Sequence, residues 1–410
     1  MNKLLKEFKD RGYFYQCTNE LELSALLNKE SIHAYIGFDS TAPSLHVGSL
    51  LQIMCLRLLQ KHGHRPIVLL GGGTTRIGDP SGKEETRKIL SEKQIESNIN
   101  NLKKVFKIFL KTNNEKLKPI FINNYKWLSK LNYINFLRDI GKHFTINKML
   151  TFDSVKLRLE REQSLSYMEF NYMILQAYDF YELNKSNKCK LQIGGSDQWG
   201  NIVNGVELIR RMLKKESFGI TSPLITLASG AKMGKTEKGA VWLNQKLFSP
   251  YDYWQFWRNT DDRDVIKFLK MFTDKDISEI EILKNKNINE LKILLANETT
   301  SMLHGKVAAK KAAETAEKTF GAGSFGDDLP VIKIKRNQLN IGMNIIDVVI
   351  MSNLLKSKSE ARRAIKNLGI KINNNTVNND NSNITIDDFK DDILKLSHGK
   401  KNHVLFKIIN

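Results

Sequence analysis

The sequence predicts an α/β protein in which a doubly wound parallel sheet is followed by a helical part and a small α+β unit. Three observations support this prediction. Short apolar runs alternate with helical patterns through the first 245 residues, as in a parallel sheet with helices on both faces. Residues 249–320 show only helical patterning, and the last 80 residues mix two helical patterns with two strand-like runs.

The chain begins with an amphipathic helical pattern over residues 1–30, a strand Ile32–Phe38 and a helix Leu45–His62. The unpaired N–H groups at the start of a helix that follows a strand and a small-residue loop form a site for phosphate. His46 can donate to a phosphate oxygen, and Gly48 lets a flat ring approach the backbone. Taken alone, this pattern is more often a capped helix with a surface histidine.

The alternation continues up to residue 227. The expected elements are a strand Pro66–Leu70, a glycine-rich loop 71–83, a helix over 88–111, a strand Pro119–Ile122, an irregular segment 125–165, a helix Tyr167–Glu182, a strand Lys190–Gly194, a helix Asn201–Leu213 and a strand Ile220–Leu227. On the helix that starts at Tyr167, the spacing of Tyr172, Gln176 and Asp179 (i, i+4, i+7) places all three on one face.

The C-terminal part divides into three segments. Residues 246–322 are expected to be helical, and residues 323–340 have the composition of a linker. Residues 341–410 form the small unit, with expected helices Asn344–Leu355 and Ser359–Asn367 and strands Ile370–Ile372 and Val404–Ile409. Residues 331–410 contain 14 Lys and Arg against 7 Asp and Glu, so this tail carries a net charge of +7.

The composition favours a polyanionic partner. The 410 residues include 64 Lys and Arg and 44 Asp and Glu, a formal net charge of +20, and nucleic acid is the obvious partner for such a chain. A lysine-rich surface that is merely solvated is the alternative. Three cysteines without metal-like spacing indicate a reducing compartment. No signal peptide or membrane span is evident, so we expect a soluble cytoplasmic protein with no membrane partner.

A second motif changes the interpretation of His46. Residues 231–236 read Ala-Lys-Met-Gly-Lys-Thr, nearly two hundred residues after His46-Val-Gly-Ser. In this order and at this spacing, the two motifs resemble the HIGH and KMSKS motifs of class I aminoacyl-tRNA synthetases. Two positions depart from that pattern: Ser49 stands where HIGH has its second histidine, and Gly234 where KMSKS has its first serine.

Four further motifs narrow the resemblance. Together they resemble bacterial-type tyrosyl-tRNA synthetases: Tyr35-Ile-Gly-Phe-Asp39, Ile77–Lys83, Asn171–Phe180 and Gln192–Asn201. The stretch Ser357–Lys366 resembles the ribosomal S-four-type RNA-binding module. The resemblance implies a Rossmann-like catalytic domain over 1–245, with a connective insertion near 125–165 at a dimer interface. It also implies an α-helical anticodon-side domain over 246–322, a linker over 323–340 and an RNA-binding domain over 341–410.

The resemblance further implies a reaction and its partners. L-tyrosine and ATP form tyrosyl-adenylate and pyrophosphate, and the tyrosyl group then passes to the 3′-terminal adenosine of tRNA-Tyr. ATP would be a substrate that arrives with Mg²⁺, without a permanent cofactor and without a metal site on the protein. The enzyme would be a homodimer.

The resemblance implies three sets of site residues. Those for tyrosine are Tyr35, Asp79, Tyr172, Gln176, Asp179, Gln192 and Gln198. Those for ATP are Gly37, Asp39, His46, Gly48, Ser49, Gly195, Asp197 and Lys235. Those that would stabilise the charge of the transition state are Thr41, His46, Lys83, Arg87, Lys232, Lys235 and Thr236.

The chemistry of Asp179 agrees with the tyrosine assignment. A buried carboxylate that accepts the phenol hydrogen bond would reject phenylalanine, because it would then be left without its partner. Two alternatives stay open. A tryptophanyl enzyme shares the motifs, but an indole pocket would not need both Asp179 and Tyr35. An RNA-binding protein that has lost catalysis would not need His46 or the two lysines of the 232–236 motif.

Overall fold

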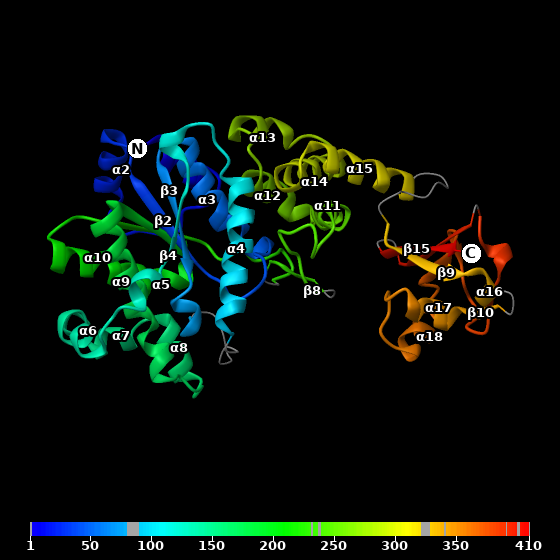
Figure 1. The fold of residues 1–410 in the computed structure, drawn as a ribbon. Helices are drawn as coiled ribbons and strands as arrows, with labels where there is room; N and C mark the ends of the chain where they lie inside the picture. The colour runs from blue at the N-terminus through cyan, green and yellow to red at the C-terminus, as the bar shows by residue number, and fades with distance from the viewer. Residues whose placement is uncertain are drawn as a thin grey trace. The chain divides into compact units, whose positions relative to one another are not determined.

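The computed structural model describes residues 2–79, 90–230, 233–236, 239–320, 329–339, 342–390, 392–399 and 402–409. The chain forms two compact units, Met1–Gly305 and Lys306–Asn410 (Figure 1). Within the described residues, no helix combines the length and the apolar character needed to cross a bilayer.

A six-stranded sheet forms the centre of the first unit, with strand order β1-β6-β5-β2-β3-β4. Five strands are parallel, and only the edge strand β1 runs antiparallel to its neighbour. The strands are β1 (Gln16–Cys17), β2 (His33–Asp39), β3 (Arg65–Gly71), β4 (Ile120–Asn123), β5 (Cys189–Gly195) and β6 (Phe218–Ser222). The order reverses between β2 and β5, so the predicted doubly wound sheet is confirmed.

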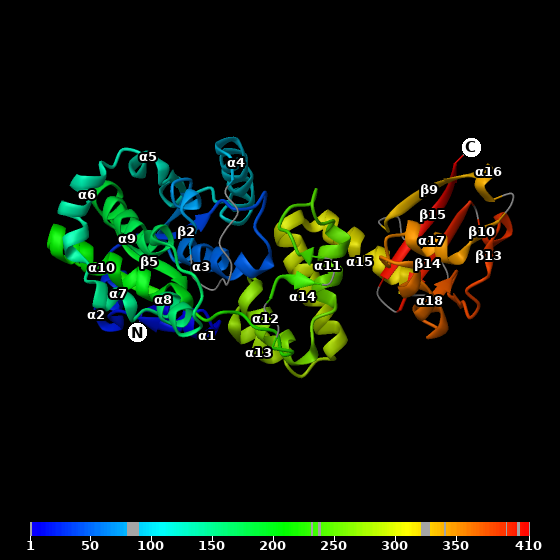
Figure 2. The same cartoon turned by 90° about the horizontal axis from the view of Figure 1, so that it is seen from below.

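Helices cover both faces of this sheet (Figure 2). On one face the ring of Phe38 packs against Phe106, with centroids 4.7 Å apart. On the other face Tyr35 and Leu69 join a buried apolar cluster with the helices that follow the insertion. The helices are α3 (Leu50–Lys61) and α4 (Glu92–Phe109) on the first face, and α9 (Tyr167–Asn187) and α10 (Trp199–Leu213) on the second.

Two predictions near the N-terminus are wrong. Residues 1–30 are not one helical stretch but α1 (Lys3–Asp10) and α2 (Glu20–Lys29), because β1 between them pairs with the edge of β6. The helix expected from Leu45 starts only at Leu50, after a 3₁₀ turn over Val47–Ser49. His46 is extended there, and its ring rather than a helical turn receives the N–H of Gly48.

The strand expected over Ile220–Leu227 is also shorter than predicted, since β6 ends at Ser222. Proline follows at position 223 and has no N–H to continue the ladder. The segment 125–165, expected to be irregular, contains four short helices. These are α5 (Tyr125–Leu128), α6 (Tyr133–Asp139), α7 (Ile146–Leu150) and α8 (Asp153–Glu160).

The helical pattern after residue 249 is confirmed. In the first unit, Trp257, Phe268 and Phe272 form a buried aromatic core between these helices. The helices are α11 (Pro250–Arg258), α12 (Val265–Phe272), α13 (Ile277–Leu283) and α14 (Ile288–His304), and α15 (Lys306–Phe320) belongs to the second unit.

The second unit is built on a five-stranded sheet of order β12-β11-β14-β15-β9. Strand β9 comes from within the segment expected to be a linker and pairs in parallel with β15. Both predicted helices and both predicted strands are present, whereas β14 has no counterpart in the prediction. After α15, the helices are α16 (Arg336–Leu339), α17 (Ile345–Met351) and α18 (Lys358–Lys366). The strands of the sheet are β9 (Val331–Lys335), β11 (Ile370–Ile372), β12 (Asn375–Thr376), β14 (Ile393–His398) and β15 (Asn402–Ile409), and β10 (Met343–Asn344) pairs separately with β13 (Asn383–Ile384).

Candidate active site

A cavity of about 370 Å³ opens at the carboxyl ends of β2 and β5. This is where the strand order reverses, the usual position for a ligand in a doubly wound sheet. Fifteen residues from the sequence prediction line it. They are Tyr35, Gly37, Asp39, Thr41, His46, Gly48, Ser49, Asp79, Tyr172, Gln176, Asp179, Gln192, Gly195, Asp197 and Gln198. The shared face expected for the three α9 residues is confirmed.

Asp179 is the most deeply buried acid of the cavity, with 2% of its surface exposed. Its Oδ2 accepts from Asn124 Nδ2 at 2.8 Å and its Oδ1 from Trp127 Nε1 at 2.7 Å. Burial raises the pKa of Asp179 to about 7, although the two donors favour the carboxylate. The hydroxyl of Tyr35 is buried and has no hydrogen-bond partner among the described residues. Burial, and secondarily the charge of Asp179, raises the pKa of Tyr35.

A chain of hydrogen bonds joins Asp179 to Asp39. Thr74 Oγ1 donates to Asp39 Oδ1 at 2.7 Å, and Tyr172 Oη donates to Asp39 Oδ2 at 3.1 Å. Asn124 Nδ2 also lies 3.0 Å from Thr74 Oγ1, to which it donates. The two carboxylates are therefore held by one network that spans α9, β2 and the loop after β3.

Amide side chains form a second part of the cavity wall. Gln198 Nε2 donates to Asp79 Oδ2 at 3.0 Å. Asn201 Nδ2 donates to Gln176 Oε1 at 3.0 Å and to Gln198 Oε1 at 3.1 Å. The Oε1 of Gln192 is buried and unpaired among the described residues. Together with Asp79, this wall offers carboxylate and amide oxygens to a cation.

The first motif is joined directly to the segment that follows β8 (Gly239–Ala240), after the second motif. Val47 N–H donates to Val241 O at 2.9 Å, and Leu243 N–H donates to Leu45 O at 2.8 Å. The expectation that free helical N–H groups point at a ligand is wrong for Gly48, whose N–H donates to His46 Nδ1 at 3.0 Å. Its lack of a side chain still matters, since a Cβ there would lie 2.6 Å from His46 Cε1.

The lysine motif is described only in part. Gly234 has φ +104°, and a Cβ there would lie 2.8 Å from His46 Nδ1, so the two motifs are in close contact. The backbone of Lys235 and Thr236 forms β7, which pairs with β8 (Gly239–Ala240). Lys83, Arg87 and Lys232 lie outside the described residues, and so does Lys238.

Four contributors to the network were not predicted. Asn124 lies two residues after the predicted strand Pro119–Ile122 and directly after β4, so a polar residue near the carboxyl end of a parallel strand was a usable signal. Thr74 lies in the glycine-rich loop, where any hydroxyl was a candidate for a hydrogen bond in the site. Asn201 ends the motif Gln192–Asn201, which was the signal that could have found it. Trp127 carries no local signal, because only the tertiary fold brings it to Asp179. Among the described residues, no group of three or more His, Cys, Asp or Glu is arranged to hold a metal ion.

Comparison with known proteins agrees with this architecture. The family described as tRNA synthetases class I (W and Y) matches residues 27–321. The tyrosine–tRNA ligase SYY-like C-terminal domain matches residues 322–406. The chain therefore belongs to the class I tRNA synthetase family of the W and Y type.

Within that family, the similarity is to the tyrosine enzymes. The tyrosine–tRNA ligase of Pelagibacter ubique is 68% identical over 409 residues, which cover 100% of both chains. That of Rickettsia massiliae is 51% identical over 99% of this chain and 100% of its own. A truncated mitochondrial tyrosyl-tRNA synthetase from Aspergillus nidulans superposes with a TM-score of 0.70 at 29% identity, over 77% of this chain and 94% of that one. The resemblance inferred from the motifs is confirmed.

Proposed function

We propose that the chain is a tyrosine–tRNA ligase, which forms tyrosyl-adenylate from L-tyrosine and ATP and transfers the tyrosyl group to tRNA-Tyr. The two bacterial tyrosine–tRNA ligases described above, similar along their full length, support this activity. It belongs in the cytoplasm, where tRNA is charged for protein synthesis.

The observation that carries the tyrosine specificity is the pair formed by Asp179 and Tyr35. Asp179 is fixed by two donors, and the Tyr35 hydroxyl is buried without a partner among the described residues. A phenol can donate to the carboxylate and accept from Tyr35, and so satisfies both groups. Phenylalanine would leave the buried Tyr35 hydroxyl without a partner and would not give Asp179 the hydrogen bond of the phenol, each at a cost of about 1–3 kcal/mol. An indole N–H can donate but cannot accept.

The polar wall orients the reacting end of the amino acid. The substrate ammonium is bound by Asp79, Tyr172 and Gln176, and Gln192 and Gln198 lie beside its carboxylate. That carboxylate is already a nucleophile at neutral pH, so in-line attack on the α-phosphorus of ATP needs no general base. The work of the site is positioning and stabilisation of charge.

Residues around the first motif hold ATP. Asp39, Gly195 and Asp197 lie along the ribose, Gly37, Gly48 and Ser49 give the nucleotide access to the backbone, and Thr41 and His46 face the departing phosphates. Lys83, Arg87, Lys232, Lys235 and Thr236 donate to pyrophosphate as it leaves. Motif similarity alone supports these last five positions.

Magnesium fits this site as a companion of ATP. Mg²⁺ is commonly held by phosphates with one or two carboxylates. The carboxylates that line the cavity are Asp39, Asp79, Asp179 and Asp197. Of these, Asp39 and Asp79 accept hydrogen bonds from neighbouring side chains, and Asp179 lies at the tyrosine end. When bound, the ion would neutralise phosphate charge, and the residues of the chain would position the nucleophile.

Amino-acid-dependent exchange of labelled pyrophosphate into ATP, without tRNA, tests this function. We expect exchange with tyrosine and none above background with phenylalanine or tryptophan. Exchange with tryptophan would reassign the specificity. No exchange with any of the three, in a protein whose circular dichroism shows it folded, would refute the ligase function.

We also propose that the enzyme is a homodimer through the predicted connective segment, residues 125–165, extended to residue 168 at the start of α9. This short segment contains ten of the 21 large apolar side chains that are exposed among the described residues. Ile134 is 67% exposed, Tyr133 59% and Tyr167 65%. Clustered exposed apolar surface marks interaction sites.

Light scattering after size exclusion tests the dimer. Ile134→Asp should yield monomers at concentrations at which the wild type is dimeric. Ile282→Asp is the matched control, because Ile282 is 75% exposed but lies on α13, far from this segment in sequence. A monomeric wild type, or an Ile134→Asp variant that remains a dimer, would contradict the proposed interface.

The domain boundaries complete the proposal. We assign residues 1–245 to catalysis, 246–322 to the anticodon side and 341–410 to RNA binding, joined by 323–340. The tail carries a net charge of +7 and would contact tRNA chiefly through phosphates, with an affinity that falls as salt rises.

A further inference from the structure

The segment that leads into the lysine motif leaves the cavity and then contacts the start of α12. Leu224 lines the cavity. Two residues later, Thr226 O accepts from Lys267 Nζ at 3.2 Å, and Ala228 N–H donates to Asp264 Oδ2 at 2.7 Å. The motif itself begins at Lys232, four residues after Ala228. The first turn of α12 therefore holds two backbone groups of this segment.

Asp264 is an unusual residue to find in this position. It is 5% exposed and occupies the N-cap of α12, yet its side chain does not cap its own helix. Its carboxylate instead accepts from a backbone group 36 residues earlier in the chain. The N-terminal end of α12 favours a negative charge, and a hydrogen bond to a carboxylate is stronger than one between neutral groups.

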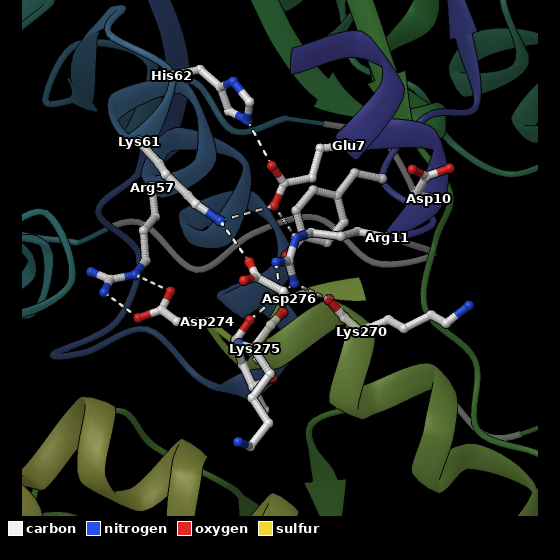
Figure 3. A network of polar contacts seen from close by, with 12 residues as sticks. Glu7, Asp10, Arg11, Arg57, Lys61, His62, Lys270, Asp274, Lys275 and Asp276 are labelled. Carbon is white, nitrogen blue, oxygen red and sulfur yellow. Dashed lines mark hydrogen bonds and ion pairs between the residues drawn. The ribbon is translucent and has the colours of Figure 1, made fainter. Parts of the chain in front are cut away.

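The other end of α12 is tied to the body of the first unit (Figure 3). Arg11, which is 3% exposed, donates through Nη1 to Lys270 O at 2.8 Å and to Thr273 O at 3.1 Å. Tyr13 Oη donates to Met271 O at 2.6 Å. These donors satisfy carbonyl groups of the last turn, which have no partners within the helix.

Helix α12 is also linked to α3. Arg57 donates through Nε to Oδ1 and through Nη2 to Oδ2 of Asp274, just after α12 (Figure 3). Helix α3 begins directly after His46 and the turn that follows it. Helices α3 and α12 are thus linked to each other. Helix α3 follows the first motif, and helix α12 contacts the segment before the lysine motif.

We propose that Asp264, assisted by Lys267, is a positioning residue for amino-acid activation: it fixes the segment before the lysine motif relative to His46. The proposal rests on the proposed ligase function. It adds a role for two residues that touch neither the cavity nor the substrates. Loss of the hydrogen bond between Ala228 and Asp264 should slow adenylate formation. It should not weaken tyrosine binding, because Asp179 and Tyr35 lie on other elements.

The test is the single-turnover rate of tyrosyl-adenylate formation in the full-length enzyme, measured beside the tyrosine Kd without ATP. Asp264→Ala should lower the rate about 10- to 100-fold, the usual cost of a misplaced reacting group, and change the Kd less than about twofold. Asp264→Asn keeps an oxygen that can accept from Ala228 and should restore most of the rate. Lys267→Met removes the donor from a half-buried side chain, and we expect a smaller loss from it.

Asp262→Ala is the matched control. Asp262 lies two residues away and pairs with Lys292 at the surface instead of the segment before the motif, so its rate should equal that of the wild type. If Asp264→Ala does not fold, Lys267→Met decides the question. Unchanged rates in both variants, or rate losses matched by equal losses in tyrosine affinity, would overturn the inference. A wild-type enzyme that forms no adenylate would instead refute the proposed function.

Discussion

The Asp179 carboxylate should destabilise the fold as it ionises, and Asp179→Asn should remove this effect. Burial raises the pKa of Asp179 from 3.8 to about 7 in the folded protein. The folded chain therefore holds this proton more tightly than the unfolded chain does. The resulting stabilisation is present at low pH and is lost as the pH rises from 3.8 through about 7.

The size of the effect follows from these two values. Between about pH 5.5 and pH 8.5, ionisation of this group should lower the free energy of unfolding of the wild type by about 2 kcal/mol. Asparagine cannot ionise, so the variant should lack this part of the pH dependence. The asparagine amide can accept from only one of Asn124 and Trp127. The lost hydrogen bond lowers the free energy of unfolding of the variant, and this loss is about the same at every pH.

Urea unfolding followed by circular dichroism at several pH values measures both effects. The lost hydrogen bond appears as a constant difference in the free energy of unfolding between variant and wild type. The lost ionisation appears as a different slope of that free energy against pH. Wild-type and Asp179→Asn stabilities that run parallel across this range would refute the assignment of a raised pKa to Asp179. Tyrosine, which needs the carboxylate, should bind the wild type more tightly as the pH rises through 7 and should bind the variant weakly at every pH.

Three further predictions concern contacts already described. Trp127→Phe keeps an aromatic ring but removes the donor to Asp179, so tyrosine binding, measured by equilibrium dialysis, should weaken about tenfold. Gly48→Ala would place a Cβ 2.6 Å from His46 Cε1, so adenylate formation should slow at least about tenfold while the tyrosine Kd stays unchanged. Burial opposes ionisation of Glu7, but hydrogen bonds from His62 and Arg11 outweigh it and lower its pKa to about 2. Glu7→Gln should therefore cost about 1–2 kcal/mol of stability at neutral pH, after allowance for its partial exposure.

Each of these predictions has an outcome that contradicts it. Tyrosine affinity that survives Trp127→Phe would mean that the indole does not support Asp179. A Gly48→Ala enzyme with normal rates would mean that the turn can shift to admit a methyl group. The stability supplied by Glu7 is present above its unfolded pKa of 4.5 and lost as the pH falls toward 2. A stability difference for Glu7→Gln that stays constant from neutral pH to about pH 3 would therefore count against the lowered pKa.

Local sequence determined the elements and the family. Apolar runs such as Pro66–Leu70 become buried parallel strands, because only strands covered on both faces tolerate continuous apolar side chains. The i, i+4, i+7 spacing on α9 was sufficient to place Tyr172, Gln176 and Asp179 on one face, since helix geometry is local. Two predicted boundaries are wrong: the helix start at Leu45 and the continuation of the strand beyond Ser222. Both depend on contacts with other strands and loops as well as on the local pattern.

Only the tertiary structure decided which groups meet. The two donors that hold the Asp179 carboxylate, Asn124 and Trp127, lie more than 50 residues earlier in the chain, and the burial that raises its pKa is likewise a product of the fold. Asp264 likewise accepts a hydrogen bond from Ala228, which lies 36 residues earlier in the chain. A hydrogen bond between distant residues leaves no periodic trace in a sequence, because its geometry is set by the packing of whole elements. The sequence by itself thus predicted fifteen of the residues that line the cavity and the chemistry they can offer. The fold added contributors such as Asn124 and Trp127 and decided the partners, the burial and therefore the charge of the groups.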